Sequence, residues 1–191
     1  MARCTDSADP APNPSYIRSV ARLAPNGFKE LCRRREAILI VAHFLGLDTA
    51  LHVLDLLEGA SDILGSLRDE LSRKVPPLPL NEALRLAERT KYALHRVLTP
   101  LESIRQEANQ HDGLKEILDK AEAIPADFDN RVFGVLETPG IDHAGPYTLA
   151  LASKNLQRLF SEVQTLLDRL TRWHKETEAE ILRLRGELAN E

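Results

Sequence analysis

The C-terminal segment from residue 147 to residue 191 limits most strongly what this chain can fold into. It contains no proline, and its single glycine, Gly186, lies close to its end. This composition predicts one continuous α-helix, because proline and glycine are the residues that interrupt a helix most strongly. With a rise of about 1.5 Å per residue the helix would be roughly 65 Å long, which exceeds the width of a domain of this size. Part of it is therefore expected to project or to lie against a partner.

Apolar residues recur along this segment at heptad spacing, and nine of the twelve residues at the two repeating positions are apolar. This pattern is typical of a coiled-coil seam. Two interpretations fit it, an intermolecular coiled coil and a long helix packed within its own bundle, and we favour self-association or partner binding. The seam consists of Leu149, Ser153, Leu156, Phe160, Val163, Leu167, Leu170, His174, Thr177, Ile181, Leu184 and Leu188. The predicted partner interface is Phe160, Val163, Leu167, Leu170, Ile181, Leu184 and Leu188.

The rest of the chain also favours helices. Its apolar residues are mostly leucine and alanine, and only 5% of its residues are aromatic, so β-sheet is disfavoured. The predicted fold class is all-α, a helical bundle with a long C-terminal amphipathic helix. The predicted parts are a disordered leader (1–14), a helical bundle core (15–124), a non-helical connector (125–146) and the long helix (147–191).

A buried helical hairpin is predicted near the start of the bundle. Gly46 is expected to end a helix over residues 28–45, and Asp48 is expected to cap the next helix. A helix-turn-helix that reads DNA would present basic or amide side chains on its second helix. Residues 50–55 are mainly apolar instead, which favours the buried hairpin.

Prolines predict the later helix boundaries. The segment 76–79, Pro-Pro-Leu-Pro, is expected to end the second helix of the hairpin, and Asn81 is expected to cap a third. Pro100 predicts a kink or break within that third helix. A shorter helix over 114–124 is expected to end at Pro125.

The predicted connector at 125–146 lacks helical periodicity, and its central sequence RVFGVLE could form a short strand. It holds Asp127, Asp129 and His143, which could bind a divalent cation in a small metal-dependent enzyme. Aspartate and glycine are also common in any solvated loop, and we favour that interpretation. His43, His52 and Asp48 likewise lack the ligand set of a closed zinc site. We predict no metal site and no cofactor.

The charge distribution gives only local attraction to nucleic acid. The net charge is −4, whereas residues 1–40 carry seven basic and four acidic side chains. Consecutive arginines point in different directions around a helix, and no aromatic residues interleave with them. Nucleic-acid binding by an accessory subunit or regulator is therefore the less favoured alternative. The basic cluster consists of Arg18, Arg22, Lys29, Arg33, Arg34 and Arg35.

No sequence motif indicates catalysis or secretion. The chain has two cysteines, no glycine-rich phosphate loop and no nucleophile elbow, and its N-terminus lacks a signal-peptide pattern. The longest apolar run, residues 37–47, is shorter than a membrane span. We therefore predict a soluble, cytoplasmic, non-enzymatic assembly subunit that binds itself or another helical protein and does not enter a membrane.

Overall fold

The computed structural model describes residues 25–73, 78–138 and 145–190. These residues form helices and contain no strand, which confirms the predicted all-α class. The predicted leader at 1–14 lies outside the described residues. The elements in chain order are α2 (Pro25–Leu71), α3 (Leu80–Leu98), α4 (Leu101–Ala108), α5 (Asp112–Phe128), a π-helical turn (Asp129–Phe133), α6 (Gly134–Glu137) and α7 (Gly145–Asn190).

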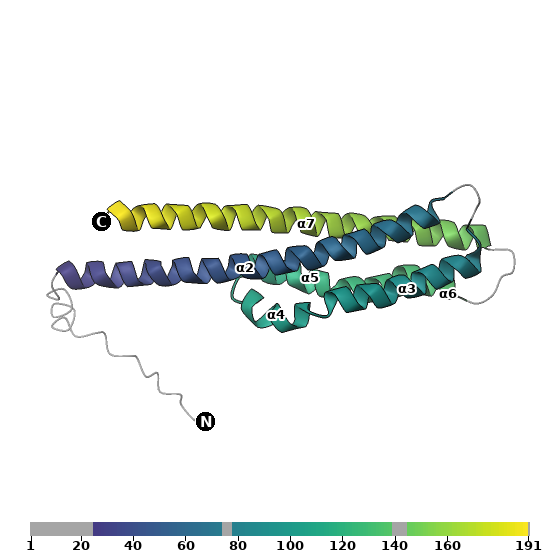
Figure 1. Cartoon of the computed structure of the whole chain (residues 1–191), viewed down its shortest axis with the longest axis horizontal. Coiled ribbons are helices and arrows are strands. Elements are labelled where there is room, and N and C mark those ends of the chain that lie inside the picture. The colour runs from purple at the N-terminus through teal and green to yellow at the C-terminus, as the bar shows by residue number, and fades with distance from the viewer. Residues whose placement is uncertain (1–24, 74–77, 139–144, 191) are drawn as a thin grey trace, which may run out of the picture.

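The two longest helices, α2 and α7, lie side by side and antiparallel (Figure 1). They contain 47 and 46 residues, so each is roughly 70 Å long. Their contact is the most extensive between any two described elements. The predicted long C-terminal helix is therefore confirmed, and α2 packs along it.

The shorter helices cover only one half of the α2–α7 pair, the half farther from the start of α2 and the end of α7 (Figure 1). This half is a helical bundle with one continuous core, to which α2, α3, α5 and α7 all contribute. Its largest fully buried side chains include Val53, Leu57, Leu64, Leu94, Leu114, Leu118, Phe128, Leu156, Leu159 and Leu170.

The other half of the α2–α7 pair projects beyond the bundle as a two-helix arm (Figure 1). We define the arm as residues 25–45 of α2 and residues 174–190 of α7. Its base lies where His111 packs against Gly46 and where Gly113 packs against Trp173. Each arm helix is backed by one other helix, whereas each long helix in the bundle touches several.

The predicted hairpin at Gly46 is wrong, because α2 continues through this residue as one helix. A Cβ atom at position 46 would lie 2.6 Å from Nε2 of His111. Glycine is thus required here by the close approach of a side chain and not by a turn. A glycine within a helix costs about 1 kcal/mol relative to alanine, which packing on both sides of α2 outweighs. The helix-turn-helix alternative fails for the same reason.

Most of the predicted connector is also helical. Pro125 lies inside α5, and residues 129–137 continue as the π-helical turn and α6, so the possible strand is absent. Residues 139–144 lie outside the described part of the chain. Apolar side chains recur every four residues through this segment, and their burial outweighs the hydrogen bond lost at proline. They are Ile124, Phe128, Val132 and Leu136, each at most 4% exposed.

The other predicted boundaries have mixed outcomes. The break at Pro100 is confirmed, because α3 ends at Leu98 and α4 begins at Leu101. Asn81 is not the N-cap of α3. The helix begins at Leu80, and Pro79 occupies the N-cap position. The Asn81 side chain accepts a hydrogen bond from the next backbone N–H within the first helical turn.

We expect Gly46→Ala to destabilise the protein by about 1–3 kcal/mol, because the added methyl group collides with the His111 ring. Gly186→Ala is the matched control. It adds the same methyl group where no atom lies within 4 Å, and should stabilise α7 by up to about 1 kcal/mol.

Urea denaturation of the single variants, and of Gly46→Ala combined with His111→Ser, measures this. The cost of Gly46→Ala should largely disappear in the His111→Ser background. An undiminished cost would mean that Gly46 is needed for its backbone conformation, as the predicted hairpin requires.

Candidate interaction surface

The α7 residues predicted as a partner interface are covered by the chain itself. Val163, Leu170, Ile181 and Leu184 are each at most 5% exposed. Phe160 and Leu167 are partly buried and pack against the bundle core, and the side chain of Leu188 lies outside the described part. The seam therefore faces inward along both the bundle and the arm. The described seam residues are therefore not exposed to a partner in this structure.

The structure brings only part of the basic cluster together. Arg33, Arg34 and Arg35 are consecutive on the arm section of α2, and all three are exposed. Arg18 and Arg22 lie outside the described residues. Lys29 belongs to α2, but its side chain lies outside the described part. The cluster within the described chain is thus a short basic section of the arm.

The arm section of α2 carries large exposed aliphatic side chains. Ile38 is 68% exposed, Val41 is 59% exposed and Leu45 is 60% exposed. Their spacing of three and four residues puts them on one face of the helix. We call these three residues the α2 stripe. Leu39 and Phe44, on either side of it, are also exposed.

The same face of α2 becomes polar where the bundle begins. The next residues at helical spacing after Leu45 are Asp48 and His52, whose side chains are 78% and 65% exposed. If this face of α2 contacted only water, its residues in the arm would be expected to be polar as well. Contiguous exposed apolar patches on soluble proteins commonly mark interaction sites. The change at the base of the arm therefore indicates a separate role for the α2 stripe.

α7 does not cover the α2 stripe, because it packs on other faces of α2. In the arm, the Arg185 guanidinium lies 4.9 Å from the centre of the Phe44 ring. At the arm's base, Leu170 and His174 of α7 lie beside Leu54 of α2. In this contact α7 buries Ile181 and Leu184 but leaves Leu182 exposed, whereas α2 is apolar on more faces than one helix can cover.

A small aromatic cluster fixes the base of the arm to the bundle. The ring of His111 lies 6.4 Å from that of His43 on α2 and 5.7 Å from that of Trp173 on α7, measured between centroids. Burial lowers the pKa of His111 below the usual imidazole value, and the nearby His43 acts in the same direction. The packed arrangement therefore favours a neutral His111.

Among the described residues, one helix is long and apolar enough to cross a membrane by length and composition. It is α2, with an 18-residue window of mean hydropathy 1.9 of which 28% is buried. In a bilayer the adjoining section of α7 would have to accompany it, with exposed Arg183, Arg185 and Glu187. Charged side chains at that depth cost roughly 3 kcal/mol each or more.

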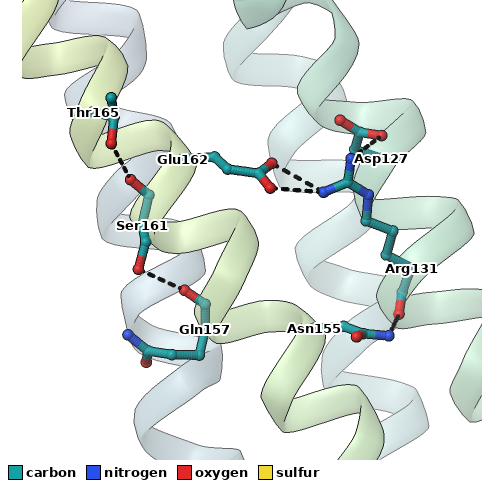
Figure 2. Close-up of polar contacts among 7 residues, drawn as sticks. All are labelled: Asp127, Arg131, Asn155, Gln157, Ser161, Glu162 and Thr165. Carbon is teal, nitrogen blue, oxygen red and sulfur yellow. Dashed lines mark hydrogen bonds and ion pairs between the residues drawn. The ribbon is translucent and has the colours of Figure 1, made fainter.

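The carboxylates of the predicted connector are paired with basic side chains. Asp127 lies 3.3 Å from Arg131, whose guanidinium also donates to both carboxylate oxygens of Glu162 on α7, at 2.9 and 3.0 Å (Figure 2). Asp129 lies 2.9 Å from the Lys91 ammonium, and their hydrogen bond raises the pKa of Lys91. These contacts join α3, the π-helical turn and α7.

The backbone of the π-helical turn is bound to α7 as well. Nδ2 of Asn155 donates a hydrogen bond of 2.7 Å to the carbonyl oxygen of Arg131 (Figure 2). His143, the third residue of the predicted cation site, lies outside the described residues. Within the described ranges, no three His, Cys, Asp or Glu side chains are grouped so that they could hold a metal ion. The ion pairs of Asp127 and Asp129 lie between helices of the bundle.

No known family model matches this sequence, and no curated protein or solved structure is significantly similar to it. The surface and packing of the chain itself therefore have to indicate its function. Two features are most informative: the burial of the α7 seam within the chain and the exposure of the α2 stripe. Sequence reasoning missed the stripe because residues 37–47 are apolar on most faces, which resembles a buried helix.

We expect the protein to lose stability as the pH falls below about 6.5, the usual imidazole pKa. The pKa of His111 is lower in the folded chain than in the unfolded chain. Its stabilising contribution is therefore complete above the unfolded pKa and is lost as the pH falls through the folded pKa.

Thermal unfolding between about pH 7.5 and about pH 5.5 measures this effect. His111→Gln should show a shallower loss of Tm than the wild type. His52→Gln changes an exposed histidine and should retain the wild-type slope. Equal slopes for all three proteins would show that His111 does not cause the loss.

Proposed function

We propose that this chain is a non-enzymatic interaction protein of the cytoplasm that binds another helical protein through the α2 stripe. The observation that carries the proposal is the stripe itself, three large aliphatic side chains, each more than half exposed, on one face of a helix. Fully burying one such side chain stabilises a complex by roughly 1.5–3 kcal/mol. A partner that covered all three would gain several times that amount.

The geometry of the α2 stripe favours a helical partner. Its side chains stand on a straight helix at spacings of three and four residues, which is the pattern that a second helix covers by packing ridges into grooves. A backbone strand would have no sheet edge to pair with, because the described chain contains only helices. The bundle supports this role by holding α2 and α7 rigidly at the base of the arm.

The two other predicted functions gain less support. Arg33–Arg35 could contact phosphates, but the helix face that follows them is apolar and has no aromatic stacking platform for bases. The aspartates suggested for a metal-dependent enzyme are engaged in ion pairs with Lys91 and Arg131. Protein binding is the function that uses the exposed aliphatic residues.

A photo-crosslinking experiment tests this proposal. Val41 is replaced by a photoreactive phenylalanine derivative in the full chain, expressed in its own cells, and irradiated. We expect a discrete covalent adduct with a protein. The same replacement at Asp55, an exposed polar position of α2 within the bundle, is the control and should give none. Absence of a protein adduct at position 41, or adducts with lipid alone, would contradict the proposed function.

A further inference from the structure

We infer that the α2 stripe binds the α2 stripe of a second copy of this chain, antiparallel and centred on Val41, so that α2 and α7 of the two copies form a four-helix bundle along this contact. This inference rests on the proposed function and specifies its partner. It follows from the order of charged and apolar residues along the exposed face of α2.

The face that carries the stripe has a basic end and an acidic end. Arg34 lies seven residues before Val41 and Asp48 lies seven residues after it, and a spacing of seven returns to nearly the same face of a helix. Both side chains are exposed. Between them the face holds Ile38, Val41 and Leu45. The sequence along the face is therefore basic, apolar and then acidic.

A twofold axis through Val41 makes this surface complementary to itself. In an antiparallel pair, Arg34 of each copy lies opposite Asp48 of the other, and Ile38 lies within one residue of the position opposite Leu45. Val41 lies opposite its own copy at the centre. A parallel pair would bring the two Arg34 side chains together and the two Asp48 side chains together, which like-charge repulsion opposes. The charge pattern thus selects the antiparallel arrangement.

The rest of the arm leaves room for this arrangement. α7 packs on other faces of α2, so it does not occupy the stripe. The antiparallel direction places the two bundles at opposite ends of the shared contact. The contact from Arg34 to Asp48 spans roughly 20 Å, so α2 and α7 of the two copies would form a four-helix bundle over about four helical turns. Each α2 would then be backed by helices on both sides.

Asp48 is suited to contact a second copy. Its side chain is 78% exposed, and the nearest basic side chain that the structure gives it is His52, at 4.0 Å. An exposed carboxylate at the border of an apolar patch is typical of the polar rim of an interface. The Asp48 carboxylate favours a basic residue at the facing position of the second copy and disfavours an acidic residue there.

Light scattering coupled to size-exclusion chromatography tests the inference on the full chain. We expect a dimer for the wild type and a dissociation constant at least about tenfold weaker for Arg34→Glu and for Asp48→Arg, because each creates two like-charge contacts. The double variant should recover the wild-type affinity to within about threefold. Because both positions are exposed, circular dichroism should show unchanged helix content in all variants.

Disulfide formation tests the register in a background of Cys4→Ser and Cys32→Ser. Val41→Cys should form a disulfide-linked dimer on mild oxidation, since position 41 lies opposite itself. Ile38→Cys and Leu45→Cys should not do so alone, but an equimolar mixture of the two should. Efficient linkage of each alone would indicate a parallel pair and would overturn the antiparallel inference.

The failures of the two proposals are distinguishable. A wild-type monomer, or a dimer that the charge variants leave unchanged, overturns self-pairing. If Val41 then crosslinks to a different protein, the proposed function stands without the self-pairing. If no protein adduct forms and the chain floats with anionic phosphatidylserine vesicles through its arm, both proposals are wrong.

Discussion

The packing of α7 along the whole length of α2 is the contact on which the rest of the structure depends. It buries the apolar seam of α7 inside the chain, from Leu156 in the bundle to Leu184 in the arm. It also holds the two helices together in the arm, which α3, α4 and α5 do not cover. Without this contact neither helix would have a covered apolar face in the arm. Helices in proteins owe most of their stability to such packing.

In the arm this pairing buries the apolar seam of α7 but leaves part of the apolar surface of α2 exposed. α7 is amphipathic in the arm, and a single partner helix covers its seam residues Ile181 and Leu184, although Leu182 stays exposed. The arm section of α2 is apolar on several faces, and Ile38, Val41 and Leu45 remain exposed after α7 has packed. The proposed interaction surface is thus the part of α2 that one neighbour does not cover. The basic and acidic residues at its two ends give that surface a direction.

Much of the fold could be predicted from the sequence, because heptad spacing and the absence of proline define α7 directly. The sequence could not show which helix would cover the seam, since inward and outward packing give the same spacing. Gly46 was misassigned because glycine serves both turns and close approaches, and only the position of His111 distinguishes them. The four-residue spacing of Phe128 and Val132 did carry a helical signal that Pro125 obscured.

The candidate surface was harder to predict than the fold. An apolar helix of a soluble protein is usually buried on all sides, and residues 37–47 fit that expectation by composition. Their exposure depends on where the bundle ends, which is set by His111 and Trp173 at the base of the arm. That position results from tertiary packing among segments far apart in the sequence. Local patterns therefore indicate an apolar helix but not which of its residues stay exposed.

The most direct test of this account measures whether α7 covers α2 within one chain. Spin labels at Ala37 on α2 and Glu187 on α7 would be measured by pulsed electron resonance, with labelled protein diluted in excess unlabelled protein. We expect a narrow distance distribution at about 20 Å that dilution leaves unchanged, since packed helices lie roughly 8–10 Å apart. A broad, long distribution, or a short distance that dilution removes, would show that α7 pairs outside its own chain and would contradict the account.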